Sequence, residues 1–167
     1  MKIGTRLAAM AIATAAFFVI AFGQSTPPPE DASVGRGRSS AMLAEKELLL
    51  AVNQSRREYG MAPLHWSESL ADAARRHAAM MAKHGEAEHT FEGEPSLLTR
   101  VKQTGVHFGW LSENVTEGPS AQFIHSQFMK SPKHRGNILD TDMNSVGIGV
   151  VERGGEYYAV EDFAELH

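Results

Sequence analysis

The chain of 167 residues contains no cysteine. This absence excludes a disulfide scaffold, a thiolate zinc site, a cysteine nucleophile and a lipid-modified cysteine anchor. Basic residues are also few, with 16 Lys and Arg against 20 Asp and Glu and a formal net charge of −4. Because binding to a phosphate backbone needs a surplus of basic side chains, we expect no nucleic acid as a partner.

The sequence also lacks the short motifs of several common enzyme classes. It contains no HExxH, GxSxG, P-loop or GxGxxG pattern. The usual sequence support for a metalloprotease, a serine hydrolase or a nucleotide-binding protein is therefore missing. The hydrophobic fraction of 43% and charged fraction of 22% are typical of a globular domain rather than of a disordered chain.

The N-terminal residues have the pattern of an export signal. Lys2 and Arg6 precede an apolar run from Leu7 to Phe22, and Ala21 and Gly23 place small residues before a cleavage site after Gly23. The run is shorter than the roughly 20 apolar residues of a membrane-spanning helix. We expect residues 1–23 to be a signal peptide and the protein to be secreted or periplasmic, with a membrane as partner only if the signal stays uncleaved.

Residues 24–40 have the composition of a linker. They read QSTPPPEDASVGRGRSS, with three consecutive prolines and no large apolar residue except Val34. Such a segment cannot supply a hydrophobic core, so we expect a linker here and a folded domain over residues 41–167.

Hydrophobic periodicity predicts helices first and strands last in this domain. The helices are expected over about 41–59, 68–84, 95–104, 119–130 and 132–139, a strand over 110–116, and a hairpin of 146–150 with 157–163 around Gly154-Gly155. Gly147 and Gly149 share one face of the first hairpin strand, which indicates close approach of another element. The expected fold is α+β, with an antiparallel sheet covered by helices.

Glu113 is the most informative single residue. The alternation of its strand places it on the same face as Leu111 and Val115. A carboxylate that faces inward is costly unless it is paired, hydrogen-bonded or bound to a metal. The functional interpretation is a ligand or a general base. The structural alternative is a carboxylate that bonds backbone amides or an arginine and holds a loop in place.

Three histidines differ in what their positions indicate. His134 falls at the third position of the short helix that Ser131 caps, where the helix dipole favours a neutral imidazole. A neutral imidazole can ligate a metal or accept a proton. The alternative is an ordinary solvated histidine in the first turn. His89 follows the end of a helix, where a ligand or an ordinary polar loop residue is expected. His77 lies on an apolar helix stripe and is interpreted as a core histidine.

The order of several short segments resembles the CAP superfamily, also called the SCP domain, which includes cysteine-rich secretory proteins, antigen 5 and pathogenesis-related proteins. In its lack of cysteine the chain resembles the bacterial members of this superfamily. The similarity covers about residues 44–163 and rests on segments that are weak alone and strong in this order: Val52–Arg57 with Gly60, Pro63–Trp66, Leu70-Ala71, His89, Ser112–Val115, Ser131–Leu139 and Val146–Val150.

The resemblance implies an α–β–α sandwich with a central cavity. In many eukaryotic members of the family two histidines and two glutamates line this cavity, and some of these members bind zinc there. By motif, His89 and His134 match the two histidines and Glu113 matches one glutamate. Ser131 stands where the second glutamate would be. Two imidazoles and one carboxylate can still hold zinc with a water as fourth ligand. Equally, the three side chains could hydrogen-bond one another and pin three segments together.

Three functions follow as hypotheses. The first, which we favour, is a secreted module that binds a small apolar ligand. The second is a metal-dependent hydrolase in which zinc on His89, Glu113 and His134 activates water, or in which Glu113 is a general base. The third is an interaction domain for a component of the cell envelope, held away from it by the linker.

Overall fold

The computed structural model describes residues 32–167, so the predicted signal peptide and the first part of the predicted linker lie outside the described residues. The helices are α1 (Ala32–Glu58), α2 (Glu68–His84), α3 (Leu97–Lys102), α4 (Ala121–Lys130) and α5 (Pro132–Ile138). The strands are β1 (His65–Trp66), β2 (Phe108–Gly118), β3 (Ser145–Arg153) and β4 (Glu156–Leu166). Among these residues, no helix combines the length and the apolar character needed to cross a bilayer.

The strands form one sheet in the order β1-β3-β4-β2. β3 and β4 make the predicted hairpin, and β2 pairs antiparallel with the other side of β4. The expectation of a wholly antiparallel sheet is wrong in one respect, because β1 pairs in parallel with the start of β3. A strand of two residues is too short for alternation to be visible in the sequence.

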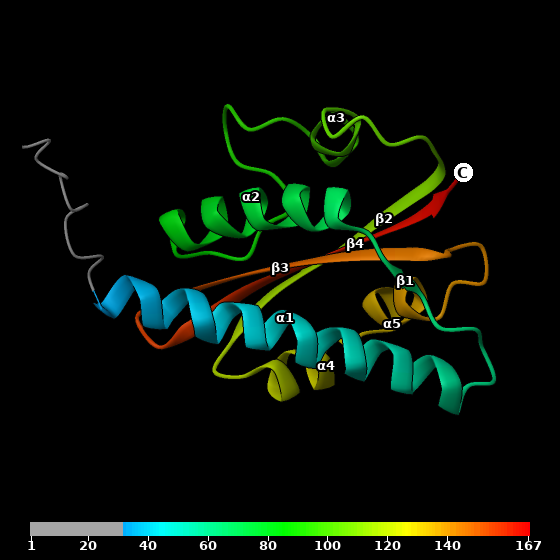
Figure 1. The fold of residues 1–167 in the computed structure, drawn as a ribbon, viewed down its shortest axis with the longest axis horizontal. Coiled ribbons are helices and arrows are strands. Elements are labelled where there is room, and N and C mark those ends of the chain that lie inside the picture. Colours follow the sequence, from blue (N-terminus) through cyan, green and yellow to red (C-terminus); the bar gives the residue numbers. More distant parts are fainter. Residues whose placement is uncertain (1–31) are drawn as a thin grey trace, which may run out of the picture.

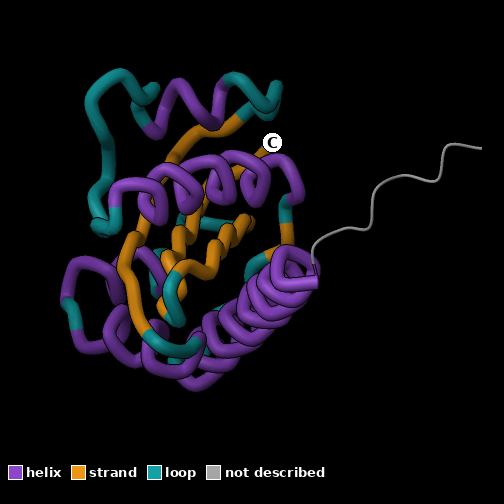
Figure 2. The backbone as a smooth tube through the Cα atoms, turned by 90° about the vertical axis from the view of Figure 1, so that its left-hand side faces the viewer, coloured by secondary structure: helices purple, strands orange, loops and turns teal. Residues whose placement is uncertain are grey.

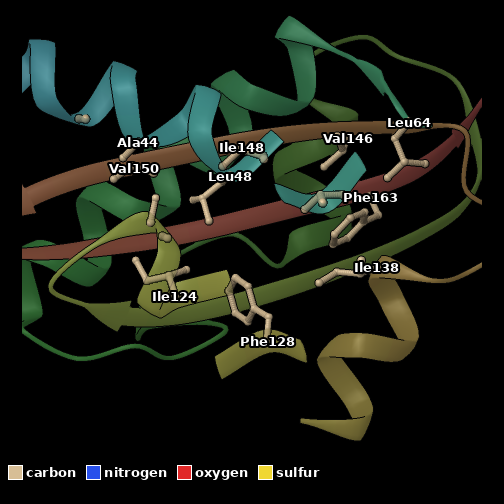
Figure 3. Close-up of a cluster of buried hydrophobic side chains, with 14 of the residues drawn as sticks. Ala44, Leu48, Leu64, Ile124, Phe128, Ile138, Val146, Ile148, Val150 and Phe163 are labelled. Atoms are coloured by element: carbon tan, nitrogen blue, oxygen red, sulfur yellow. The ribbon is translucent and has the colours of Figure 1, made fainter. Parts of the chain in front are cut away.

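Helices cover both faces of the sheet, which confirms the α–β–α sandwich. Figure 1 shows α2 and α3 on one side of the strands and α1, α4 and α5 on the other, and Figure 2 shows the same layers from the side. The larger core cluster fills the space between the sheet and α1, α4 and α5 (Figure 3). It includes Leu48 from α1, Phe128 from α4 and Phe163 from β4, all with no exposed surface.

α2 lies against the opposite face at very close range. A Cβ atom on Gly147 would stand 2.1 Å from the backbone nitrogen of Ala71, and one on Gly149 would stand 2.2 Å from that of Arg75. The glycine face predicted from the sequence is therefore the surface on which α2 packs, backbone against backbone.

α1 begins earlier than the sequence predicts. It starts at Ala32, so residues 32–40 are helical although their composition predicts a linker. Ser39 and Ser40 each donate a side-chain hydrogen bond to a carbonyl one turn back, at 3.1 and 2.9 Å. Extending an existing helix costs far less than starting one, so the helix nucleated on the core continues through Gly35 and Gly37 despite their low helix propensity.

Candidate functional site

The structure brings two of the candidate residues, His89 and Glu113, into direct contact. Glu113 lies on β2 and faces α2, with a side chain only 3% exposed. His89 stands in the loop between α2 and α3, and its Nδ1 lies 2.8 Å from one carboxylate oxygen of Glu113. The other oxygen accepts a hydrogen bond from the buried guanidinium of Arg100 on α3. Both carboxylate oxygens are thus engaged by cationic or potentially cationic groups.

A second acid–base pair, formed by His77 and Glu94, lies next to the pair of His89 and Glu113. His77 of α2 is fully buried, with Nδ1 2.7 Å from a carboxylate oxygen of Glu94 and Nε2 2.9 Å from the carbonyl of Glu88. Arg100 also lies 3.8 Å from Glu94. His77 is therefore the satisfied core histidine expected from its helix position, and Arg100 joins the two buried carboxylates.

Asp162 adds a third buried carboxyl group to this face. It is the register partner of Glu113 across β2 and β4, and neither of its carboxyl oxygens has a hydrogen-bond partner. Burial, followed by the negative charge of Glu113, raises the pKa of Asp162 well above its ordinary value. The neutral form of Asp162 is therefore favoured, which lowers the negative charge that accumulates beside the buried Glu113.

His89 is the exposed member of the group. Its side chain is 60% exposed, and the hydrogen bond with Glu113 raises its pKa, against a smaller opposing effect of burial. The cationic form of His89 is therefore favoured relative to a free histidine. Because Nδ1 is oriented by Glu113, the other ring nitrogen is the one available for chemistry.

His134 approaches from a different element. It lies on α5, where Ser131 accepts the helix-capping hydrogen bond from the His134 backbone N–H at 3.5 Å. Its ring packs edge-on against Phe128 at 5.2 Å between ring centroids. Burial lowers the pKa of His134, and the nearby charge of His89 lowers it further, as does Lys133. The neutral form of His134 is thus favoured relative to a free histidine, in the direction that its helix position predicts, and His134 lies within electrostatic range of His89.

Asparagine side chains tie α5 to the edge of β2. Asn137 donates to the Glu113 carbonyl at 3.2 Å and to the Asn114 side-chain oxygen at 2.9 Å. Asn114 in turn donates to the His134 carbonyl at 3.2 Å and to a carboxylate oxygen of Glu161 at 3.1 Å. These bonds hold the segment with His134 beside the strand with Glu113.

The three predicted metal ligands, His89, Glu113 and His134, are not arranged around a common point at which a metal ion could bind. No cluster of three or more histidines and acids among residues 32–167 is arranged to hold a metal ion. Glu113 is bonded to Arg100, whose positive charge opposes a cation at the same carboxylate. Ser131 is occupied as a helix cap and cannot replace the missing glutamate. Zinc binding therefore stays a prediction, and these residues do not fit it in this arrangement.

The structural alternative for Glu113 describes the site better than the ligand interpretation. The sequence suggested an arginine partner without identifying it, and the structure assigns Arg100. Glu94 and Asp162 were not predicted at all. Arg100 lies beside the apolar Leu97 and Val101 on a short helix, and this position within an apolar stripe was the one available signal.

A separate groove opens between α1, β1 and α2, with a volume of about 370 Å³. Its lining residues are Met42, Glu45, Lys46, Leu49, Trp66, Glu68 and Arg75. The guanidinium of Arg75 bridges the two helices through bonds of 2.9 and 2.8 Å to Glu45, and it lies 6.0 Å from the centre of the Trp66 ring. Trp66 donates its indole N–H to Glu68 at 2.8 Å.

Similar proteins identify the fold and the family. The chain is 28% identical over 117 residues to the uncharacterized protein YkwD of Bacillus subtilis, a match that covers 70% of this chain and 46% of YkwD. The chain thus spans less than half the length of this relative. The model of the cysteine-rich secretory protein family, CAP, matches residues 49–163.

Solved structures support the same fold at low sequence identity. An extracellular SCP-domain protein of Bacillus anthracis superposes with a TM-score of 0.73 at 19% identity, covering 83% of this chain and 45% of that one. An outer surface protein of Borrelia burgdorferi gives 0.68 at 18% identity, covering 74% and 93%. With the family model matching most of the described residues, the chain belongs to the CAP family of cysteine-rich secretory proteins.

Proposed function

We propose that this chain is an exported CAP-domain module that binds a small, uncharged apolar ligand in the groove between α1, β1 and α2. The observation that carries the proposal is the groove itself. Its volume of about 370 Å³ lies within the range of about 300–1,000 Å³ found for small-molecule sites. Met42, Leu49 and Trp66 give it a largely apolar lining.

The charges around the groove favour a neutral ligand. Glu45 and Glu68 are balanced by Lys46 and Arg75, and Arg75 is bonded to both acids. A charged ligand would gain no net Coulomb attraction and would lose its hydration on entry. An apolar ligand without charge gains from burial alone.

Export is supported by the N-terminal sequence and by the relatives. Residues 1–23 have the pattern of a signal peptide. The structural relatives in Bacillus anthracis and Borrelia burgdorferi are described as an extracellular protein and an outer surface protein. Mass spectrometry of the exported protein tests the fate of this signal, because cleavage after Gly23 gives a chain that starts at Gln24, whereas an intact N-terminus means that the apolar run is retained as an anchor.

Trp66 offers a direct test of ligand binding. The chain has two tryptophans, so Trp110→Phe leaves Trp66 as the single indole. Decanol, decanoate and decylamine share one chain length and differ in charge. We expect saturable changes in Trp66 fluorescence, with decanol binding most tightly.

Neighbouring leucines supply a matched pair of variants for this test. Leu49 lines the groove, whereas Leu50 is exposed outside it. Leu49→Gln should weaken decanol binding about tenfold, and Leu50→Gln should leave it unchanged. Equal effects of both variants, or no saturable binding by the folded protein, would contradict the proposed function. Circular dichroism establishes that each variant is folded.

One observation favours hydrolysis as a second candidate function. A histidine whose Nδ1 bonds a carboxylate, with its other nitrogen near solvent, resembles the base of a catalytic dyad. In this version His89 is the general base and Glu113 orients it, which reverses the role first expected for Glu113. No step through a metal is part of this candidate.

A simple ester substrate tests the hydrolytic candidate. Hydrolysis of p-nitrophenyl acetate should rise with pH as His89 loses its proton, and His89→Ala should abolish the pH-dependent part. His107→Ala, at an exposed loop position, is the control. Identical rates for the wild type, both variants and free imidazole at equal concentration would reject catalysis at this site.

A further inference from the structure

α1 carries a second apolar surface on the side away from the core. Its core face consists of Ala41, Ala44, Leu48 and Val52, which are buried. Met42, Leu43 and Leu50, here called the outer stripe, are 56%, 57% and 68% exposed. More than half of each residue is exposed, so the described chain leaves most of this surface uncovered.

Helix geometry makes the outer stripe continuous and gives it basic residues. Leu43, Lys46 and Leu50 fall at i, i+3 and i+7 and share one face. At about 100° per residue, Leu43 lies about 200° around the helix from Ala41 on the core face. Lys46 stands within the stripe and Arg36 at its N-terminal end, both exposed, while Glu47 is the exposed acid beside them.

Apolar side chains around a lysine are typical of helices that lie in a membrane interface. The aliphatic part of a lysine packs with its apolar neighbours while the ammonium group reaches the lipid phosphates. Half-buried Trp66, which lines the groove together with Met42, adds an aromatic side chain of the kind enriched at the membrane–water boundary.

The length of chain before α1 limits how far this helix can lie from an apolar run that is inserted in a membrane. The apolar run ends at Phe22, and residues 23–31 connect it to Ala32. Nine residues span at most about 30 Å when fully extended, and the helix covers about 27 Å from Ala32 to Leu50. If the apolar run stays inserted in a bilayer, the whole outer stripe can reach the surface of that bilayer.

From the exposed outer stripe, its lysine and its distance from the apolar run, we propose that α1 docks on a lipid surface through Met42, Leu43 and Leu50. The inference goes beyond the proposed ligand binding and does not depend on it, since Leu43 and Leu50 do not line the groove, although Met42 and Lys46 lie at its edge and belong to both surfaces. Where the apolar run is retained it supplies attachment, and in either case the outer stripe contacts the lipid and sets the orientation, with α1 lying flat on the membrane.

The absence of cysteine makes a local test possible on the full chain. Ser39→Cys introduces the single thiol, one turn before Leu43 on the same face, for an environment-sensitive fluorophore. Vesicles of phosphatidylcholine and phosphatidylglycerol should shift its emission to the blue, and brominated lipids should quench it. A label on Leu98→Cys in α3, in the opposite helical layer, should not respond.

Substitution of the outer stripe completes the test. In the Ser39→Cys background, Leu43→Gln with Leu50→Gln should weaken the vesicle-dependent shift by about tenfold per leucine in partition coefficient. Both positions are mostly exposed, so the variant should melt at the temperature of the parent and should bind decanol normally. If the parent protein shows the vesicle-dependent shift but no decanol binding, the proposed function fails and the docking inference stands. If it binds decanol but shows no shift, the docking inference fails and the proposed function stands.

Two results would overturn the docking proposal. The first is a protein that sediments with vesicles while the label at position 39 remains in water, because attachment then involves only the N-terminal run. The second is a blue shift without vesicles that grows with protein concentration, because a second copy of the chain then covers the outer stripe.

Discussion

At the scale of single residues, two adjacent carboxyl groups of β4 face opposite layers of the sandwich. Asp162 faces α2, and Glu161 faces the layer of α4 and α5, where it is fully buried. One oxygen of Glu161 accepts from Asn114 and the other has no partner. Burial raises the pKa of Glu161 to about 8, although the bond from Asn114 acts in the opposite direction.

Glu161 should make the protein less stable as the pH rises. Between its unfolded pKa of 4.5 and its folded pKa of about 8, the folded state holds a proton that the unfolded state has lost. The unfolding equilibrium constant therefore increases by about tenfold per pH unit in this window through this group. Glu161→Gln keeps the shape without the charge and should flatten the slope, as measured by urea unfolding from pH 5 to 9.

Glu156→Gln is the matched control for this prediction, because Glu156 is an exposed glutamate on the same strand. It should keep the wild-type slope. Part of the slope should also survive in Glu161→Gln, since the raised pKa of Asp162 acts in the same direction. A Glu161→Gln protein whose slope equals that of the wild type would show that Glu161 is not buried as a neutral acid.

Arg100 should be among the most sensitive charged residues of the domain. Arg100→Met removes the cation shared by Glu94 and Glu113 and leaves both carboxylates buried without it. Breaking a buried ion pair costs about 3–5 kcal/mol of unfolding free energy. Denaturant unfolding measures this loss, and Arg57→Met, at an exposed position on α1, should change stability by less than about 0.5 kcal/mol.

A compensating substitution separates loss of charge balance from loss of packing at Arg100. Glu113→Gln in the Arg100→Met background removes one uncompensated carboxylate, so it should restore part of the lost stability. If the double variant is as unstable as the sum of both single variants, the two side chains act independently and the described ion pair contributes little.

At the scale of elements, the contact between α2 and β3 depends on Gly147 and Gly149, which have no side chain to separate the helix from the strand. Gly147→Ala would place a methyl group 2.1 Å from the backbone of α2, which cannot yield as a flexible side chain would. The helix must move away from the sheet, and overpacking of this kind costs about 1–3 kcal/mol or more. Thermal unfolding should show a clear loss of stability, or no folded protein.

Gly136→Ala gives the opposite expectation at another glycine. Gly136 lies within α5, and nothing stands within 4 Å of an added Cβ atom. Alanine has the higher helix propensity, so this variant should gain up to about 1 kcal/mol. If Gly147→Ala were tolerated as well as Gly136→Ala, the close approach of α2 to β3 would be wrong.

At the scale of the whole molecule, the sandwich is held by apolar clusters on both faces of the sheet. The described chain contains no disulfide, and the charged residues around Glu113 are paired with one another. We therefore expect EDTA and reductant to leave the melting temperature unchanged. A decrease with EDTA, reversed by zinc, would show that a metal contributes to stability.

Calorimetric titration with zinc examines the site itself. With Arg100 bonded to Glu113, the wild type should show no tight stoichiometric binding. Stoichiometric binding that disappears in a folded His89→Ala/His134→Ala variant would instead establish the metal site that the family resemblance implies.

The sequence by itself determined the α+β class, most helices, the terminal hairpin and the family, because these depend on local periodicity, turn residues and short motifs in order. It also placed Ser131 as a helix cap and Gly147 as a contact surface, since both follow from local geometry. Only the tertiary structure decided which residues partner Glu113. Arg100 reaches it from α3 and Asp162 lies opposite it on β4, through packing that no local pattern encodes.

The tertiary structure also decided where α1 begins and what the groove is. Residues 32–40 read as a linker by composition, yet they continue a helix that the core has already nucleated. The groove joins Leu49 of α1 to Trp66 of β1 and Arg75 of α2, segments whose proximity exists only after the sheet has brought the two helical layers together. Local chemistry thus specified the parts, and long-range packing specified which of them meet.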